Sequence, residues 1–457
     1  MEKRNQDSLI IGVSGVRGIV GETLTPEFLS RMATAFGSYV LGGKVVVGRD
    51  TRPSGEMIKN LVIGGLLSAG CTVIDLDICT TPSCQITIEE LKADGGIMIT
   101  GSHNPAEWNA LKFFSPDGIF LDSEQGKEVL DIYYRSDFIK ARYDQIKPVI
   151  RDNSVIEKHI GRILKEFDLK TISKRKFKVV LDSCNGAGSV ITPILLEKLG
   201  CEVIKLYCEP TGKFPHNPEP VPSNLKDLSY KVLEVQADIG FAQDSDADRL
   251  AIVSEKGEIL GEENSIALAV KYILNKKKGP VVINMSTTRA VDDIANEYGC
   301  NVIKTPIGEV NVVEKMRKVG AVIGGEGNGG IIYPAVHYGR DSLVGIAIVL
   351  QYMAETGKRI SELASEIPKY YIEKRKIECS KKVAVKLIEK LQKKYKNEKI
   401  DLSDGIRVDY SDSWVHVRRS GTEPVVRIIT ESKSKKKATE LNNEILIQIE
   451  EILKEGQ

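Results

Sequence analysis

A pattern of strand, helix and strand occurs three times along this chain of 457 residues. Each copy opens with a short β-branched run (VVV, VVL or VVI), continues through a polar turn and a stretch with apolar residues spaced in threes and fours, and ends in a second apolar run. Such runs are typical of buried parallel strands, so each copy is predicted to form a βαβ unit whose helix ends at a glycine. The glycines stand in the pairs Gly70-Cys71, Gly200-Cys201 and Gly299-Cys300.

The copies lie about 100 to 130 positions apart, which suits whole domains rather than the short period of a solenoid. We therefore expect an α/β protein with three tandem mixed α/β domains of similar topology, and corresponding loops that could converge on one site. Towards the C-terminus a Lys-rich helical stretch and alternating strand-like residues replace the pattern, which predicts a smaller α+β domain. The expected boundaries are 1–150, 151–255, 256–368 and 369–457.

Composition excludes several classes of protein. The 64 Lys and Arg balance the 63 Asp and Glu, so the chain lacks the charge of a nucleic-acid binder. Its longest apolar stretches, 61–69 and 343–350, are much shorter than the roughly 18 residues of a membrane helix, and its first residues do not resemble a secretory signal. Eight cysteines without a CxxC pair argue against a zinc site. We expect a cytoplasmic protein, a monomer or homodimer, that binds neither nucleic acid nor membrane.

The segment GGIMITGSHNPAEWNALKF places Ser102 in a loop directly after an apolar run. Ser and Asn favour local backbone hydrogen bonds, so a simple turn is one interpretation. A serine hydrolase is disfavoured because the GxSxG pattern is absent and His103 is adjacent in sequence. The remaining interpretation is a reactive hydroxyl at the end of a strand.

Three carboxylates alternate in the segment ADIGFAQDSDADRLAIV, between two apolar runs. Asp244, Asp246 and Asp248 could converge on one hard divalent cation. An EF-hand is disfavoured because Arg249 stands where its loop needs glycine, and because the flanks resemble strands. A solvated acidic turn is the other alternative, but three crowded carboxylates repel one another without a cation. The pattern favours a Mg²⁺ site that bridges to a phosphate.

Two further loops carry polar groups suited to a phosphorylated sugar. VIGGEGNGGIIYPAVHYGRD is Gly-rich and presents Glu326 and Asn328, although Gly-rich turns are common. VHVRRSGTEPVVRI combines guanidinium groups, hydroxyls and a glycine amide, which predicts a phosphate cradle or, alternatively, a polar hairpin. Taken together, the four loops indicate phosphoryl transfer to a sugar phosphate. The residues of the predicted cradle are Arg418, Ser420, Gly421, Thr422 and Arg427.

These segments resemble the α-D-phosphohexomutase superfamily, which includes phosphoglucomutases, phosphomannomutases and phosphoglucosamine mutases. The resemblance covers nearly the whole chain, with six motifs in family order. It implies four domains around a central cleft, a phosphosugar substrate, and a sugar 1,6-bisphosphate that serves as intermediate and activator. The matching motifs are GVSGVRG (12–18), GRDTRPS (48–54), TGSHNP (100–105), DSDADR (244–249), GEGNGG (325–330) and RRSGTEP (418–424).

The resemblance also implies roles for individual residues. Ser102 would be a phosphoserine that donates its phosphate and, with the three aspartates, holds Mg²⁺. Glu326 would bind sugar hydroxyls in both orientations of the substrate, and the Arg418 loop would bind the distal phosphate. The catalytic set that we expect is Ser102, His103, Lys112, Arg17 and Arg249.

One motif departs from the family pattern. Asn328 and Gly330 replace the Ser and His of the usual GE-x-SGH, so a general acid or base carried by that His is missing. His337 or Lys112 is the candidate replacement, and His337 is also expected among the substrate-binding residues. The GEGNGG form resembles the archaeal type of phosphoglucosamine mutase, which favours glucosamine phosphate over glucose or mannose phosphates. A sugar phosphatase and a non-catalytic sugar-phosphate sensor are the competing hypotheses.

Overall fold

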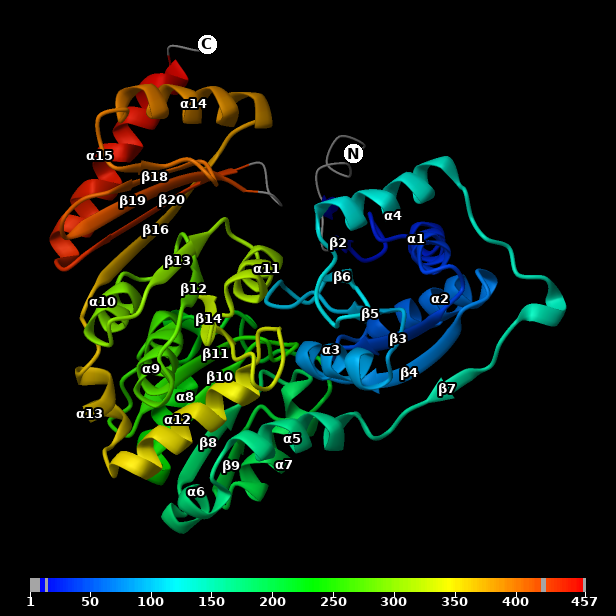
Figure 1. The fold of residues 1–457 in the computed structure, drawn as a ribbon, viewed down its shortest axis with the longest axis horizontal. Helices are drawn as coiled ribbons and strands as arrows, with labels where there is room; N and C mark the ends of the chain where they lie inside the picture. The colour runs from blue at the N-terminus through cyan, green and yellow to red at the C-terminus, as the bar shows by residue number, and fades with distance from the viewer. Residues whose placement is uncertain (1–8, 13–14, 421–424, 455–457) are drawn as a thin grey trace.

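The computed structural model describes residues 9–12, 15–420 and 425–454. The described residues form four β-sheets, each with its own helices, and the four domains follow one another around the molecule in chain order (Figure 1). This arrangement confirms the predicted fold class, three α/β domains followed by a different C-terminal one.

The first domain is built on a seven-stranded sheet of order β1-β2-β6-β5-β3-β4-β7. Helices α1 and α2 pack against each other on one face, and α3 packs against β3 and β5. Its elements are β1 (Ile10–Gly12), β2 (Gly15–Ile19), α1 (Pro26–Tyr39), β3 (Lys44–Arg49), α2 (Gly55–Ser68), β4 (Thr72–Ile78), α3 (Thr81–Glu90), β5 (Gly95–Ile99), β6 (Trp108–Phe114), α4 (Ser123–Arg135), η1 (Tyr143–Gln145) and β7 (Val149–Arg151).

The second and third domains have four-stranded sheets, of order β11-β10-β8-β9 and β13-β12-β14-β15. The second contains α5 (Val155–Glu166), α6 (Leu169–Arg175), β8 (Lys178–Asp182), α7 (Gly188–Lys198), β9 (Glu202–Leu206), η2 (Pro222–Asn224), α8 (Lys226–Val235), β10 (Ile239–Gln243) and β11 (Leu250–Ser254). The third contains α9 (Glu262–Lys276), β12 (Val281–Asn284), α10 (Ala290–Glu297), β13 (Val302–Thr305), α11 (Glu309–Val319), β14 (Ile323–Glu326), β15 (Gly330–Ile332), α12 (Ser342–Thr356) and α13 (Ile360–Ser365).

The three sheets share one topology, which confirms the repeat read from the sequence. In each, a central strand runs parallel to both neighbours, and one neighbour turns back into an antiparallel strand. The units β3-α2-β4, β8-α7-β9 and β12-α10-β13 are the predicted βαβ copies. The antiparallel turns β5–β6, β10–β11 and β14–β15 are therefore equivalent, and they carry Ser102, the three aspartates and the Glu326 loop.

The glycine after each repeated helix adopts a left-handed backbone, with φ of +80° at Gly70, +80° at Gly200 and +67° at Gly299. An alanine there is strained by roughly 1–2 kcal/mol. An added Cβ at Gly299 meets nothing within 4 Å, whereas at Gly200 it would lie 2.6 Å from Cβ of Ser173. We expect Gly299→Ala to lower the free energy of unfolding by about 1–2 kcal/mol and Gly200→Ala by clearly more, measured by urea unfolding. Equal losses would contradict this reading of the helix ends.

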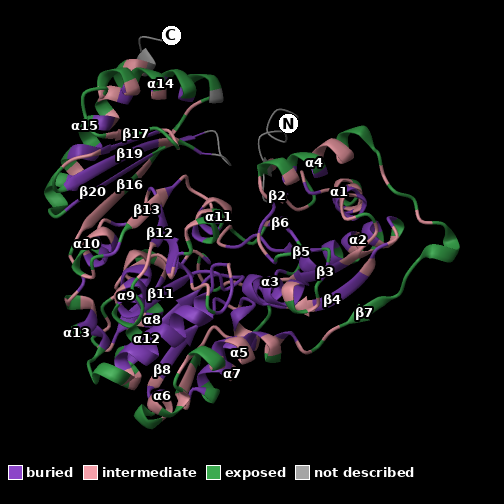
Figure 2. Ribbon diagram, viewed as in Figure 1, coloured by how far each residue is buried: buried purple, intermediate pink, exposed green. Residues whose placement is uncertain are grey.

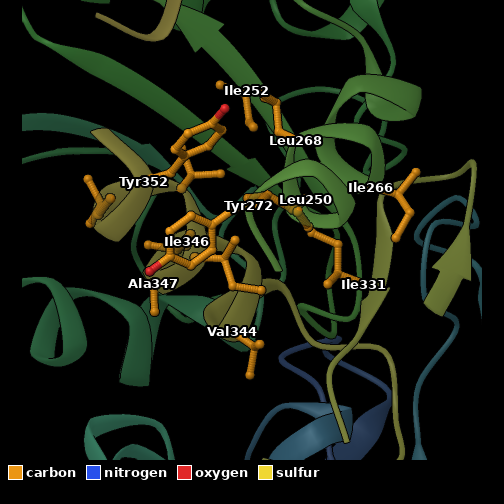
Figure 3. Close-up of a cluster of buried hydrophobic side chains, with 14 of the residues drawn as sticks. Leu250, Ile252, Ile266, Leu268, Tyr272, Ile331, Val344, Ile346, Ala347 and Tyr352 are labelled. Atoms are coloured by element: carbon orange, nitrogen blue, oxygen red, sulfur yellow. The ribbon is translucent and has the colours of Figure 1, made fainter. Parts of the chain in front are cut away.

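The second and third domains share one hydrophobic core. A continuous cluster of buried side chains joins β8, β10 and β11 to β12, β14 and β15 through α9 and α12. Figure 3 shows Leu250 and Ile252 of β11 in this cluster with Tyr272 of α9 and Ile346 of α12. Helix α12 is buried from its first residue through Met353, as its colour in Figure 2 shows. The shared core holds the aspartate turn and the Glu326 turn in one rigid body.

The C-terminal domain has an antiparallel sheet of order β16-β20-β19-β18-β17. Helices α14 and α15 pack on this sheet through a separate apolar cluster, and the sheet lies next to β13 and α10 of the third domain (Figure 1). The predicted α+β character is confirmed. The elements are β16 (Tyr371–Glu378), α14 (Lys381–Lys394), β17 (Ile400–Asp401), β18 (Ile406–Asp409), β19 (Ser413–Arg419), β20 (Val425–Ser432) and α15 (Lys435–Lys454).

Among the described helices, none is both long enough and apolar enough to span a lipid bilayer.

Candidate active site

Three of the four domains line one cavity of about 280 Å³. The equivalent turns β5–β6, β10–β11 and β14–β15 all reach it, so the expected convergence of corresponding loops is confirmed. The three aspartates are fully buried behind its wall. The polar side chains that line the cavity belong to Arg17, Ser102, His103, Lys112, Arg249, Glu309, Glu326, Asn328 and Arg340.

Ser102 stands between the cavity and the aspartate turn. The Ser102 hydroxyl donates a hydrogen bond to Oδ2 of Asp244 at 2.9 Å, and Nδ1 of His103 lies 3.4 Å from the same hydroxyl oxygen. Only 2% of the residue is exposed, and its backbone is left-handed, with φ of +48°. A non-glycine residue in this conformation costs of order 1–3 kcal/mol and is typical of functional sites, where the surrounding structure holds it.

The GRDTRPS motif supplies that support. Arg52 is fully buried and donates hydrogen bonds to the backbone carbonyls of Ser102 and Asn104, each at 2.7 Å. Asp50 accepts hydrogen bonds from Thr100 of the serine loop and from Ser245 of the aspartate turn, at 2.7 and 3.1 Å. The two buried side chains therefore fix the serine loop and join it to the second domain.

The aspartate turn has the donor set of a hard cation site. One carboxylate oxygen from each of Asp244, Asp246 and Asp248 lies within 4.8 Å of the others. Oδ1 of Asp246 and Oδ1 of Asp248 are buried without a hydrogen-bond partner, which leaves lone pairs for a ligand. Burial, and next the charges of Asp248 and Asp246, raise the pKa of Asp244 well above its usual range. Crowded, unsatisfied carboxylates of this kind fit a divalent cation with oxygen ligands. The flanks are strands and the turn is buried, which excludes an EF-hand and a solvated turn.

Basic groups surround this turn. Lys112 of β6 lies with Nζ 2.7 Å from Oδ2 of Asp246 and 3.7 Å from Oδ2 of Asp248. Burial alone would raise the pKa of Asp246, but the Lys112 ammonium and its hydrogen bond lower it below the usual range. Arg249 has Nε 4.0 Å from Oδ2 of Asp244, and Arg17 donates to Oδ1 of Asn104 at 2.7 Å. The predicted basic set is therefore assembled around the serine and the carboxylates.

The surroundings of His103 favour its neutral form. Burial, and next the positive charges of Arg249 and Arg17, hold its pKa well below the usual range of an imidazole. It faces the same cavity as those two arginines.

The turn after β14 places Glu326 and Asn328 on the cavity wall. Oε1 of Glu326 accepts hydrogen bonds from Nδ2 of Asn284 at 2.9 Å and from the Gly308 amide at 3.2 Å. Burial would raise the pKa of Glu326, but Arg340 and these donors lower it below the usual range. Glu326 is therefore a fixed carboxylate.

Sequence reasoning missed Arg340 and Glu309. Arg340 places Nη1 2.6 Å from Glu326, Nη2 2.6 Å from Asp248, and Nε 2.9 Å from Glu309. Arg340 lies in the segment VIGGEGNGGIIYPAVHYGRD and Glu309 is the first residue of α11, but neither belongs to one of the six family motifs. Their importance comes from pairing between domains, which a linear pattern does not reveal.

His337 does not join the cavity, which corrects the expectation that it binds substrate there or replaces the family His. It is 3% exposed, and its Nε2 lies 3.1 Å from Oδ2 of Asp341. The same oxygen faces Nε2 of His159 at 2.7 Å, and Nδ1 of His159 faces Oγ of Ser83. Asp341 caps α12 by accepting from the amides of its first turn, so the capping carboxylate holds His337 in a contact between three domains.

The predicted phosphate cradle of the C-terminal domain lies only partly within the described residues. Arg418, at the end of β19, donates from Nε to Oδ2 of Asp404 at 2.8 Å. The same carboxylate oxygen accepts from the amide of Ile307, which lines the cavity. Ser420 is buried, and Arg427 is an exposed residue paired in register with Arg418. Of the C-terminal side chains that the structure describes, none lines the cavity itself. Gly421 and Thr422 lie outside the described residues.

Comparisons with known proteins agree with this architecture. Models of the phosphoglucomutase/phosphomannomutase family match the chain in order: alpha/beta/alpha domain I at residues 8–140, domain II at 157–257, domain III at 262–371, and the C-terminal domain at 374–448.

Relatives match over nearly their full length. The chain is 40% identical over 454 residues to a phosphoglucomutase/phosphomannomutase of Thermococcus kodakarensis, covering 97% of this chain and 99% of the relative. It is 40% identical over 443 residues to a probable phosphoglucosamine mutase of Methanopyrus kandleri, covering 95% and 96%. A crystal structure of a phosphoglucomutase/phosphomannomutase family protein from Burkholderia thailandensis superimposes with a TM-score of 0.86 at 27% identity, covering 97% of each chain. With four domain matches in order and these identities, the chain belongs to the phosphoglucomutase/phosphomannomutase family.

Proposed function

We propose that this protein is a phosphohexomutase that interconverts hexose 6-phosphate and hexose 1-phosphate through a phosphoserine at Ser102 and a sugar 1,6-bisphosphate. The observation that carries the proposal is the position of the Ser102 hydroxyl. It lies on the wall of the cavity and 2.9 Å from Asp244 of the buried aspartate turn. A hydroxyl, a hard-cation donor set and several cations around one cavity are the parts that phosphoryl transfer requires.

In this proposal Asp244, Asp246, Asp248 and the phosphorylated Ser102 hold Mg²⁺. When bound, the cation supplies charge neutralisation for the phosphoryl group in transfer. Lys112 keeps Asp246 ionised through its 2.7 Å contact, so this carboxylate can serve as a cation ligand. Arg17 and Arg249 present guanidinium groups to phosphate oxygens on the cavity side, and the left-handed backbone at Ser102 fixes the direction of its Oγ.

The sugar lies, on this proposal, between the serine and the turn after β14. Glu326 and Asn328 hydrogen-bond its hydroxyls, and Glu326 is held rigidly enough to serve both orientations of the bisphosphate. Arg418, Ser420, Gly421, Thr422 and Arg427 bind the distal phosphate. The bridge from Arg418 through Asp404 to the Ile307 amide supports this role, since it brings the arginine to the edge of the cavity.

Glucosamine phosphate is the substrate that we propose first. The GEGNGG turn and the relative named probable phosphoglucosamine mutase support it. Glucose and mannose phosphates are the second candidates, because a relative of equal identity is named phosphoglucomutase/phosphomannomutase. Cytoplasmic location, a monomer or homodimer, and the domain boundaries given above remain predictions.

A substrate panel with metal removal tests the proposal. Protein primed with glucose 1,6-bisphosphate is expected to isomerise glucosamine 6-phosphate fastest among glucosamine, glucose and mannose 6-phosphates in the presence of Mg²⁺. A chelator should abolish turnover and added Mg²⁺ should restore it, because the cation that would neutralise the phosphoryl group in transfer is then removed. Stoichiometric free phosphate would instead indicate a sugar phosphatase, and tight binding without isomerisation would indicate a sensor.

A further inference from the structure

Phosphoryl transfer to a sugar hydroxyl also requires a group that accepts the hydroxyl proton and later returns it. When a sugar hydroxyl attacks the phosphorus of phosphoserine, its proton needs an acceptor, and when the sugar oxygen leaves again it needs the proton back. The acceptor has to line the cavity and change its protonation state near neutral pH.

Most ionisable side chains on the cavity wall fail this requirement. Arg17, Arg249 and Arg340 are guanidinium groups, which keep their protons in proteins. Lys112 is held in ion pairs with the aspartate turn. The pKa of His103 and the pKa of Glu326 are both held below their usual ranges, by burial among cations and by Arg340 respectively.

Position 330 cannot supply the missing group. An added Cβ on Gly330 would lie 2.3 Å from Cδ and 2.9 Å from Cγ of Arg340. The space beside β15 is therefore filled by the stem of Arg340, which enters the cavity wall there and reaches Glu309 on the far side. A side chain at 330 and the observed position of Arg340 exclude each other.

Glu309 meets the geometric requirement. It is the first residue of α11, it is 6% exposed, and it lines the cavity. Its Oε1 receives two long hydrogen bonds of 3.4 Å, from Nε2 of Gln85 and from the Arg340 amide. Its Oε2 is buried without a hydrogen bond, because Arg340 Nε, although 2.9 Å away, is poorly aligned with it. This oxygen is ion-paired with Arg340 but has an acceptor position that no donor fills.

Burial and the charges around Glu309 place its pKa near neutral pH. Burial raises the pKa, Arg340 lowers it, Asp248 and Glu326 raise it again, and Lys112 lowers it, with a result of about 7. These are the charged groups that act on it from the aspartate turn, β14, β6 and the Arg340 segment. A carboxyl group that is half protonated near pH 7 can serve as acceptor and donor in one cycle.

We propose that Glu309 is the general base and acid that exchanges the proton of the sugar hydroxyl; the inference rests on the proposed mutase function. As the bond between the sugar oxygen and phosphorus forms, the bond between Oγ of Ser102 and phosphorus breaks, its electron pair stays on Oγ, and the hydroxyl proton moves to Glu309. In the return step Oγ attacks the other phosphate of the bisphosphate. The sugar oxygen that leaves takes the proton back from Glu309, so the enzyme regains its starting state.

Single-turnover transfer tests this assignment. Protein phosphorylated at Ser102 with labelled bisphosphate is mixed with glucosamine 6-phosphate and quenched rapidly, for wild type, Glu309→Gln and Glu309→Asp. We expect Glu309→Gln to slow transfer of the label to sugar by about 10²–10⁴-fold. The affinity for sugar phosphate should stay within about threefold of wild type, which corresponds to about 0.65 kcal/mol of binding free energy. Glu309→Asp keeps a carboxyl group and should recover part of the rate.

The pH profile separates proton transfer from a structural role. The wild-type transfer rate should rise with pH up to about 7 and then level, because the carboxylate form accepts the proton, and this rise should vanish in Glu309→Gln. Glu314→Gln is the matched control, since Glu314 is an exposed carboxylate on the same helix and should keep wild-type transfer. Transfer by Glu309→Gln within about fivefold of wild type, or a parallel loss of sugar-phosphate binding, would overturn the assignment. If the mutase function itself were wrong, wild type and Glu314→Gln would also fail to pass label to the sugar.

Discussion

Ser102→Ala is expected to lower mutase turnover by at least about 10³-fold, because no other group can carry the phosphate between the two ends of the sugar. The substitution removes only the hydroxyl group. The loop itself should persist, since Arg52 binds the backbone carbonyls of residues 102 and 104 rather than the side chain. Steady-state turnover and phosphopeptide mapping, compared with wild type, measure the effect.

Ser115→Ala provides the matched control. Ser115 is also buried, but its hydroxyl has no hydrogen-bond partner among the described residues and does not line the cavity. Its removal should leave turnover within about twofold, because an unpaired buried hydroxyl contributes little that is favourable. A Ser102→Ala protein with more than a tenth of wild-type turnover would show that phosphate does not pass through this residue.

Arg340→Met is expected to produce the largest loss of stability. Arg340 faces Asp248, Glu326 and Glu309 in a buried cluster, so its removal leaves Glu326 and Glu309 without their basic partner. Breaking a buried ion pair from one side costs about 3–5 kcal/mol. We expect a loss of this size in the urea unfolding of the variant, together with loss of turnover, since Glu326 would no longer be held in place.

The pH dependence of that loss has a definite sign. Arg340 holds the pKa of Glu326 below its ordinary 4.5 against the opposing effect of burial. A carboxyl group with a lowered pKa in the folded state stabilises the protein above its unfolded pKa and loses this contribution as the pH falls. The difference between wild type and Arg340→Met should therefore be larger at pH 7 than at pH 4. Arg317→Met, which removes a surface pair with Asp117 and a contact with the Tyr338 ring, should cost only about 1 kcal/mol. Similar losses for both variants would contradict the buried network.

The three α/β domains, and the convergence of their equivalent loops, could be predicted from the sequence because each repeat is defined by short-range patterns. Each βαβ copy carries its own strand pattern and its own glycine, and these short-range signals give the topology without knowledge of tertiary contacts. Once the topology is repeated, equivalent turns occupy equivalent sheet edges. The grouping of Ser102 with Asp244 follows from that symmetry, although the 2.9 Å contact between them does not.

The parts that sequence reasoning missed depend on long-range pairing. Arg340 matters because it contacts Asp248, Glu326 and Glu309, which belong to three separate segments of the chain. No local pattern encodes such a cluster. His337 was expected in the cavity because it follows the Gly-rich turn, but the capping carboxylate Asp341, four residues later, holds it elsewhere. The carboxylate that caps α12 thus holds His337 outside the cavity.

The central claim is that Ser102 passes its phosphate to a hexose phosphate within the cavity where the domains meet. The most direct test follows the phosphate itself. Protein labelled with radioactive phosphate at Ser102 is mixed with unlabelled glucosamine 6-phosphate, and the products are separated over the first turnover. We predict that label leaves Ser102, appears first in a sugar bisphosphate and then in hexose monophosphate. Label found on another residue, or released only as inorganic phosphate, would contradict the account.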